Sequence, residues 1–475
     1  MHADTDATAD ANGPPPSFFA SVRDALRGVR HDYTQGPIGR AILLLAVPMV
    51  AEMAMESIFA VVDIWVVSHL GPDAVATVGL TESMLTILYA VAMGLSMGAL
   101  AIVARRIGEK DPERASIAAV QAILLGLFVA VPVALVGVIF ARPLLAAMGG
   151  TGWILEHGVG YARLMFASTV SIVLLFLINA IFRGSGDAAI SMRTLWLANA
   201  INIVLAPSLV LGLGPFPRLG ILGAALATTT GRSAGVLYQL YRLTRGDART
   251  SIARRHLRLD LETMGRMARL AVNGVGQALI SMTSWVGLVR IISTFGNAAV
   301  AGYTISIRIV MFALLPSWGM SNAAATLVGQ SLGAGKPERG EVAVRKAGTY
   351  NMIFLGVVGA LFIVLAGPIV DLFNPGAEVV PHAVRGLRIV SAGFLFYAWG
   401  MVFTAAFNGA GDTATPTLLN LVCFWLFEIP VAYALAIPLG FGPSGVYASV
   451  AVAFSVLASV SAVLFRRGKW KTRRV

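Results

Sequence analysis

Long apolar segments recur along the whole chain and constrain its fold more than any other feature of the sequence. Each is about 20 residues or longer, which is enough for a helix to cross roughly 30 Å of hydrocarbon. Hydrophobic residues make up 57% of the chain and charged residues only 13%, whereas soluble domains carry about 25% charged residues. We therefore predict an all-α integral membrane protein with twelve transmembrane helices. The predicted spans are residues 41–66, 76–103, 117–141, 160–182, 189–214, 219–243, 265–294, 299–328, 347–370, 385–407, 414–438 and 443–465.

An internal repeat divides these spans into two sets. Residues 71–114 and 296–339 align without a gap at an offset of 225 and are identical at twelve of 44 positions, including glycines, a proline and charged residues. The same offset aligns the sequence RGSGD at 183–187 with NGAGD at 408–412. In a membrane chain such a repeat is typical of transporters. We predict two parallel six-helix repeats, an N-lobe and a C-lobe, around a central cavity that opens to either side by rocking.

Lys and Arg residues cluster in alternate loops and in both tails, which predicts the orientation of the chain. By the positive-inside rule both termini are expected to be cytoplasmic, in a multi-pass protein of the cell (inner) membrane. These basic loops account for the formal net charge of +12, so we expect the lipid bilayer and not nucleic acid as a partner, and a monomer. The predicted parts are a disordered cytoplasmic tail (1–38), the N-lobe (39–243), a basic cytoplasmic linker (244–262), the C-lobe (263–467) and a basic cytoplasmic tail (468–475).

Three acidic residues, Glu52, Glu56 and Asp63, lie on the first predicted span. At about 100° per residue they fall within roughly 40° of one another, so they share one face over about 16 Å. A charged group inside a span is costly and commonly marks an ion or substrate path. We predict that Asp63, together with Glu56, binds the coupling proton or cation. The structural alternative is that these acids pair with Arg163 or Arg193.

Neutral oxygen donors on the fifth and sixth spans are candidates to complete that site. Asn199, Asn202 and Thr228 are suited to a cation shell or to hydrogen bonds with a protonated acid, although they could equally link helices. In the C-lobe, Glu428 and Arg308 are both expected near mid-depth, and we predict that they form an ion pair or gate.

The C-lobe does not repeat the acidic row, because Gln277 and Ser281 occupy the positions that correspond to Glu52 and Glu56. The residues predicted to line a substrate cavity are Pro48, Glu52, Gln277, Ser281, Trp285, Tyr303 and Trp425, whose aromatic members are suited to a cationic organic compound. The sequence has no His/Cys cluster for a metal, no phosphate-binding loop and no nucleophile motif. We therefore predict no cofactor and no enzymatic activity.

These features resemble those of the multidrug and toxic compound extrusion (MATE) family over about residues 39–465. The resemblance rests on Pro48 and Asp63 in the first span and on the Gly-Asp segments at 183–187 and 408–412. It also rests on VGQSLGAGKPERG at 328–340, which is similar to the DinF-like branch.

The resemblance implies an antiporter that exports organic, often cationic, compounds in exchange for protons or sodium ions. The family's helix-1 aspartate corresponds to Asp63, and its asparagine and threonine correspond to Asn202 and Thr228. Members with a cation site have an aspartate four residues after that asparagine, where this chain has Ala206. Because this departure removes a carboxylate from a sodium shell, we favour protons as the coupling ion and expect them to bind in the N-lobe. The alternatives are a sodium-coupled antiporter of the same family and a lipid-linked precursor flippase of the same superfamily.

Overall fold

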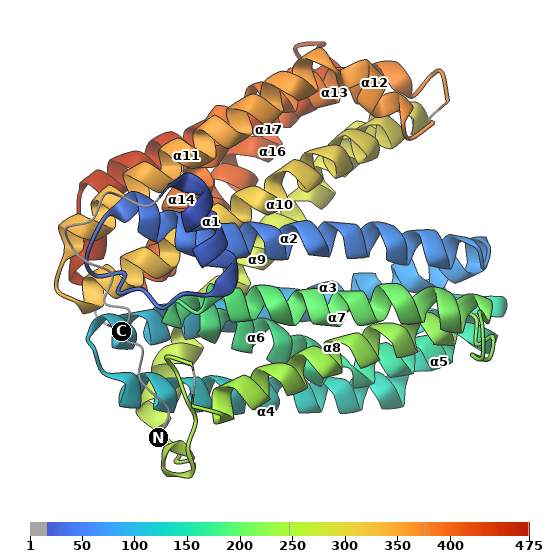
Figure 1. Cartoon of the computed structure of the whole chain (residues 1–475). Helices are drawn as coiled ribbons and strands as arrows, with labels where there is room; N and C mark the ends of the chain where they lie inside the picture. The colour runs from blue at the N-terminus through green and yellow to red at the C-terminus, as the bar shows by residue number, and fades with distance from the viewer. Residues whose placement is uncertain (1–16, 247, 375, 474) are drawn as a thin grey trace.

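The computed structural model describes residues 17–475 except 247, 375 and 474, and that part of the chain contains helices and no β-strand (Figure 1). The first half consists of α1 (Phe18–Arg27), α2 (Ile38–Ser68), α3 (Pro72–Gly108), α4 (Pro112–Ala147), α5 (Trp153–Ala167), α6 (Thr169–Ser185), α7 (Ala188–Leu211) and α8 (Ile221–Thr244). The second half consists of α9 (Leu261–Ile292), α10 (Asn297–Gly333), α11 (Pro337–Val364), α12 (Ala366–Asp371), α13 (Val380–Ala392), α14 (Phe394–Gly409), α15 (Ala414–Asn420), the π-helix η3 (Leu421–Glu428), α16 (Ile429–Ala436) and α17 (Pro443–Arg466). Short 3₁₀ turns are η1 (Arg254–His256), η2 (Ser293–Phe295) and η4 (Lys469–Thr472).

Each of the twelve predicted spans falls on one helix or on consecutive helices, which confirms the predicted all-α membrane fold. Among the residues that the structure describes, ten helical segments are long and apolar enough to cross a membrane, and α13 and α14, bent by 58°, together make an eleventh. The remaining span is α8, which is more polar because it contains three consecutive threonines and Arg232. The helices extend beyond the apolar runs where caps allow it. For example, Asp111 accepts a hydrogen bond from the backbone N–H of Arg114 (2.9 Å) at the start of α4.

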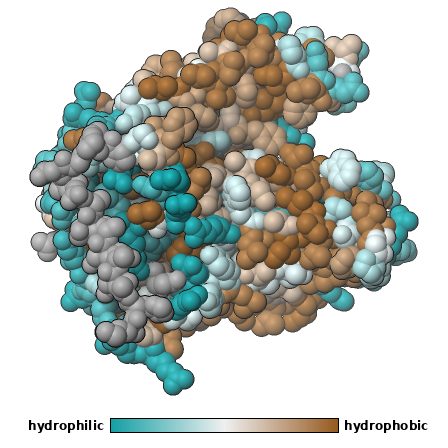
Figure 2. Space-filling view, viewed as in Figure 1, coloured by the Kyte–Doolittle hydropathy of each residue, from teal (hydrophilic) through white to brown (hydrophobic). Residues whose placement is uncertain are grey.

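The two halves diverge from a common end, which gives the molecule the shape of a V (Figure 1). The end at which they converge carries α1 and Val475, and we call it the closed end. At the opposite, open end the space-filling view shows a deep notch between the two arms (Figure 2). Hydrophobic side chains cover much of the arms in this view, and hydrophilic side chains gather at the two ends, as expected for a protein surrounded by lipid.

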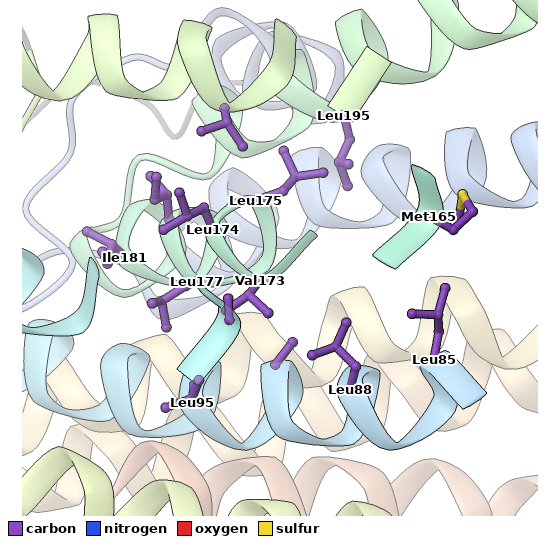
Figure 3. Close-up of a cluster of buried hydrophobic side chains, with 14 of the residues drawn as sticks. Leu85, Leu88, Leu95, Met165, Val173, Leu174, Leu175, Leu177, Ile181 and Leu195 are labelled. Atoms are coloured by element: carbon purple, nitrogen blue, oxygen red, sulfur yellow. The ribbon is translucent and has the colours of Figure 1, made fainter. Parts of the chain in front are cut away.

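Each lobe has a hydrophobic core that fixes its helices. In the N-lobe, side chains of α3, α5, α6 and α7 pack together, among them Leu85, Met165 and Leu177 (Figure 3). In the C-lobe, Tyr303 of α10 and Tyr447 of α17 belong to the corresponding core. The polar residues described below lie on helices whose positions these cores determine.

The first helix of each repeat contributes to the cores of both lobes. Residues 41–49 of α2 pack in a core with α10, α11 and α14 of the C-lobe, whereas the far end of α2 belongs to the N-lobe core. Helix α9 does the reverse, because Met267 and Ala271 join the N-lobe core and Leu288 joins that of the C-lobe. Residues 41–49 correspond to 266–274 in the repeat, so the exchange obeys the repeat symmetry.

Repeated glycines bring the lobes into backbone contact at the closed end. A Cβ atom at Gly108 would lie 2.1 Å from the carbonyl oxygen of Gln330, and one at Gly333 would lie 2.1 Å from that of Arg105. Arg105 and Gln330 are related by the same offset as the glycines, so the contact is reciprocal. The side-chain amide of Gln330 also donates a hydrogen bond to the carbonyl of Gly184, in the repeated Gly-Asp segment (2.9 Å).

The prediction of a disordered N-terminal tail is wrong for residues 17–38. Part of this segment forms α1, and the part that follows is held by Arg339 of the C-lobe, whose guanidinium donates to the carbonyls of Tyr33 (2.8 Å) and Gln35 (2.6 Å). Polar composition could not reveal this, because the acceptors are backbone carbonyls. The remainder of the predicted tail, residues 1–16, lies outside the described residues.

The predicted basic tail at 468–475 also contacts the body of the protein. Trp470 is buried, and Arg473 forms an ion pair with Asp412 (3.0 Å). The carbonyl of Arg473 accepts a hydrogen bond from Arg105 of the N-lobe (2.9 Å), so this segment joins the two lobes at the closed end.

Candidate functional site

Acidic side chains from α2 and α3 lie within electrostatic range of an arginine from α8 in the N-lobe. Arg232 interacts electrostatically with Glu56 and Asp63 of α2, and Glu82 of α3 interacts with both Asp63 and Arg232. Tyr89 of α3 lies against the arginine. We call Glu56, Asp63, Glu82, Tyr89 and Arg232 the N-lobe polar cluster.

Arg232 is held by an aromatic residue rather than by an acid. Its Nη1 donates a hydrogen bond to the Tyr89 hydroxyl (3.0 Å), and its guanidinium carbon lies 5.8 Å from the centroid of that ring. Within the described chain, no carboxylate approaches its nitrogen atoms to the 4.0 Å of an ion pair. Three carboxylates therefore share the field of one guanidinium, which leaves the cluster with excess negative charge whenever at least two acids are ionised.

Asp63 is the half-buried acid of the cluster that makes no hydrogen bond in the described chain. By contrast, Glu56 accepts a hydrogen bond from the side-chain amide of Asn199 (3.0 Å). The structure thus brings together three of the predicted coupling residues, Glu56, Asp63 and Asn199, and the coupling role of Asp63 stays a prediction.

Glu52 belongs to a separate buried ion pair. Its side chain is 1% exposed, and its Oε1 lies 3.3 Å from Nη1 of Arg183 and 3.5 Å from Nδ2 of Asn179. Asn179 Oδ1 in turn accepts a hydrogen bond from Gln239 (2.7 Å). This network connects α2 to α6 and α8, so the prediction that Glu52 lines a substrate cavity is wrong.

Glu52 therefore does form a structural ion pair, as the alternative prediction held, but neither of the two suggested partners, Arg163 and Arg193, is the partner. Arg193 donates to the carbonyls of Leu26 (3.1 Å) and Arg27 (2.9 Å) at the end of α1. Arg163 is exposed and forms no ion pair with the acids of α2 in the described chain.

Asn202 and Thr228, the other predicted coupling residues, bond to each other. The amide nitrogen of Asn202 donates to Oγ1 of Thr228 (2.9 Å), which links α7 to α8. The carbonyl oxygen of the Asn202 side chain is buried and accepts no hydrogen bond from the described residues. One neutral oxygen donor therefore remains available beside this link.

In the C-lobe, three predicted cavity residues lie near one another on α9 and η3. The side-chain amide of Asn420 donates to Oγ of Ser281 (3.0 Å) and to the carbonyl of Gln277 (3.5 Å). The indole nitrogen of Trp425 donates to the carbonyl of Ile280 (3.1 Å), and its side chain is exposed.

Three other cavity predictions fall within packed regions. Tyr303 is 2% exposed and belongs to the C-lobe core, so its assignment to a cavity wall is wrong. Pro48 is buried in α2 next to Met49, whose backbone lies 2.8 Å from where a Cβ of Gly319 would be, and it is likewise not a cavity residue. Trp285 is half-buried and packs against the C-lobe core.

The predicted ion pair between Glu428 and Arg308 is wrong. Glu428 is 3% exposed and has no ion-pair partner among the described residues, whereas Arg308 is exposed. Similar depth along two helices does not determine which way each side chain points, and here the two point to different environments.

Sequence reasoning missed Arg232, Glu82 and Tyr89 of the polar cluster, together with Arg183. Arg232 and Glu82 lie within predicted spans, so the rule applied to the acids of α2 would have identified both. Tyr89 and Arg183 carried no comparable signal, because their roles depend on contacts across helices.

Comparison with known families matches both repeats of the chain. The MatE family profile covers residues 48–208 and 273–434, together more than half of the sequence. The chain is 26% identical over 423 residues to the probable multidrug resistance protein YoeA of Bacillus subtilis, which spans 88% of this chain and 91% of that protein. It is 25% identical over 410 residues to a FAD transporter of Shewanella oneidensis, with 85% and 89% covered.

Solved structures share the fold over nearly the whole chain. A MATE transporter in complex with MaL6 superposes with a TM-score of 0.87 at 27% identity, over 93% of this chain and 99% of that one. A multidrug resistance transporter of this kind in an outward-facing conformation gives a TM-score of 0.87 at 27% identity, over 93% and 98%.

Proposed function

This chain belongs to the MATE family of multidrug efflux transporters, and we propose that it works as an antiporter that exports small organic cations in exchange for protons. Members of the family are transporters and not enzymes. The finer points, namely the coupling ion, the substrate class and the role of each residue, are our proposal. The DinF-like branch stays a prediction from residues 328–340.

The observation that carries the proposal is the imbalance of charge in the N-lobe polar cluster. Three acids lie in the field of a single Arg232, and Asp63 has no hydrogen-bond donor of its own among the described residues. Carboxylates that share one site do not all stay ionised, so at least one takes up a proton or another cation. Binding of an organic cation at this site would displace that proton, which is the exchange that an antiporter requires.

The charge of the cluster also supports the proposed substrate class. Relatives include a probable multidrug resistance protein and a FAD transporter, so the family relationship does not by itself choose between cationic and anionic compounds. An acid-rich site attracts cations and repels phosphates. Aromatic surface, such as the exposed ring of Trp425, would contact the apolar part of the compound.

Sodium coupling is the second candidate, favoured by the unpartnered side-chain oxygen of Asn202. A sodium ion needs several oxygen ligands, and the position of the family's second acid is Ala206, a buried residue with no oxygen in its side chain. We therefore keep protons as the proposed coupling ion.

Orientation follows from the distribution of Lys and Arg. If the closed end, which carries α1 and the chain's last described residue, faces the cytoplasm, the notch in Figure 2 opens to the outside. The protein would then have an outward-open conformation, in which protons enter the N-lobe polar cluster from the exterior.

The test uses the purified full-length protein in proteoliposomes, with tetraphenylphosphonium as the transported probe. An imposed pH gradient is expected to drive the probe through the wild-type protein in the direction opposite to proton flow. A sodium gradient at constant pH is expected to drive no movement. Asp63→Asn should abolish this movement, because an amide cannot exchange a proton. Asp73→Asn, at an exposed aspartate in the first turn of α3, is the matched control and should transport normally.

Two results would overturn the proposal. Movement driven by sodium alone would assign the coupling to that ion instead. Normal transport by Asp63→Asn would show that the N-lobe polar cluster does not carry the coupling proton.

A further inference from the structure

A carboxyl group in the C-lobe is buried without a partner. Glu428 is the last residue of the π-helix η3, and its side chain is 3% exposed. Its carboxylate accepts no hydrogen bond and forms no ion pair within the described chain. Its counterpart in the repeat is Ile203, so it has no equivalent in the N-lobe.

The titratable groups within electrostatic range of Glu428 are phenols and a thiol. Tyr303 of α10, Tyr397 of α14 and Cys423 of η3 interact with it electrostatically. Across the described residues, the helices packed around it bring no Arg, Lys or His side chain into electrostatic contact with its carboxylate. Any charge on Glu428 would therefore remain uncompensated by protein side chains.

The hydroxyl of Tyr303 is a second buried polar group in the same region without a partner among the described residues. This side chain is 2% exposed, its ring stacks on Tyr447 at 5.9 Å, and its hydroxyl has no hydrogen-bond partner in the described part of the protein. A buried polar group without a side-chain partner is commonly satisfied by a water or an ion, or has a functional role. The C-lobe thus has a buried acid and a buried phenol that each lack a partner.

Backbone geometry marks the same place. η3 is an eight-residue π-helical segment between α15 and α16. π-helical turns are uncommon and recur at functional sites, because the widened turn re-aims side chains at a cost in backbone hydrogen bonding. Here the widened turn ends at Glu428.

An ionised carboxylate in such surroundings costs several kcal/mol, and a buried acid without a basic partner is instead neutralised by a proton or a metal ion. Phenol hydroxyls donate to a carboxylate and accept from a carboxylic acid, so they suit both forms of the group. A metal ion would need further oxygen ligands, and the described chain has no group of three or more His, Cys, Asp or Glu side chains arranged to hold one.

We propose that Glu428, with the hydroxyls of Tyr303 and Tyr397, forms a second proton-binding site inside the C-lobe, separate from the N-lobe polar cluster. The existence of this C-lobe site does not depend on the proposed function. Any role of the site in coupling rests on the proposed function. Each lobe would then hold a titratable group, although only the N-lobe acids were expected to do so from the sequence. Because the side chain of Glu428 is 3% exposed, loss of the proton would require water or another hydrogen-bond donor to reach the carboxylate, which links proton occupancy to the packing of the C-lobe.

Infrared difference spectroscopy of the full-length protein in nanodiscs, without any transported compound, tests the site directly. Spectra recorded from about pH 5 to about pH 9 report the C=O stretch of protonated carboxyl groups. Glu428→Gln should remove one such signal that persists at neutral pH. Glu262→Gln, at an exposed glutamate in the first turn of α9, is the matched control and should retain it.

A second variant keeps the test decisive if Glu428→Gln does not fold. Tyr303→Phe removes only the hydroxyl, and it should shift the same C=O signal or its midpoint. The proposal is overturned if Glu428→Gln leaves the protonated-carboxyl spectrum unchanged. It is also overturned if the signal of Glu428 changes with sodium concentration at constant pH, since that would indicate a metal-ion site.

Failure of the proposed function would be recognised separately. If wild-type protein does not transport tetraphenylphosphonium but the signal of Glu428 is present, the site exists and the antiporter proposal fails. If transport is normal and the signal is absent, the antiporter proposal holds and the C-lobe site is refuted. If both are present, Glu428→Gln should release fewer protons per bound probe ion than the Glu262→Gln control.

Discussion

The buried ion pair between Glu52 and Arg183 allows a quantitative prediction about the stability of the N-lobe. The two charged atoms lie 3.3 Å apart, and the side chains are 1% and 11% exposed. At this distance, an effective dielectric constant of about 20 gives a gross attraction of about 5 kcal/mol. Removing one partner of such a pair costs about 3–5 kcal/mol if the remaining group stays charged, and less if, as a carboxyl group can, it takes up a proton.

Arg183→Met should therefore be destabilising at a pH at which Glu52 remains ionised without its partner. Because the two lobes share their cores, the loss is spread over the whole chain of 475 residues, and a loss of about 3–5 kcal/mol corresponds to a fall of roughly 3–5 °C in the thermal midpoint. Glu52→Gln/Arg183→Met should recover most of this loss, because no charge is then left without a partner and the amide of Gln can still bond to Asn179. Thermal unfolding in detergent, followed by tryptophan fluorescence at neutral pH, measures both effects.

Two outcomes would refute this reasoning. A midpoint for Arg183→Met within about 2 °C of wild type would mean that Glu52 is solvated or already protonated. A double variant as unstable as the sum of the two single variants would mean that the charges do not interact. A control at an exposed pair, Arg266→Met beside Glu262, should have almost no effect.

Other predictions concern the closed end. Gly108→Ala would place a Cβ 2.1 Å from the carbonyl oxygen of Gln330, and such overpacking costs about 1–3 kcal/mol. Spin-label distances across the closed end should then shift toward a wider population, and an unchanged distribution would contradict the proposed lobe contact. Glu341 lies at the start of α11, before the predicted span 347–370. A hydrogen bond from Lys471 (2.8 Å) holds the pKa of Glu341 below its usual range. An acid whose pKa is lowered by folding stabilises the folded state at any pH above its pKa in the unfolded chain, and this stabilisation is lost as the pH falls. Hydrogen exchange around Lys471 should therefore quicken below about pH 4. Glu341→Gln should remove this pH dependence, and its persistence would assign the effect to another group.

The spans and the repeat could be predicted from the sequence because both are properties of the chain in one dimension. Apolar length predicted every span, and the constant offset predicted the symmetry that relates Gly108 to Gly333. The offset also indicated where the lobes differ chemically, since Glu56 has no acidic counterpart in the C-lobe.

Partners of buried charges could not be predicted in the same way. The partner of Glu52 is Arg183, 131 residues away, and helical spacing says nothing about which distant helix lies opposite. Arg308 shows the same limit: its depth in α10 matched that of Glu428, but its side chain lies on the exposed side of the helix while Tyr303 faces inward. Depth is encoded in sequence position, whereas rotation about the helix axis relative to a neighbour emerges only from packing.

The exchange of α2 and α9 between the lobes has a consequence for how the chain folds during synthesis. Residues 41–49 emerge from the ribosome first, but their packing partners on α10, α11 and α14 belong to the second repeat. The core of the first repeat is likewise incomplete until Met267 and Ala271 have been added. Neither half is therefore an autonomous folding unit, and the first six helices must wait in the bilayer with an apolar seam unfilled. A chain cut in the linker at 244–262 should regain its structure only when both fragments are made in the same cell.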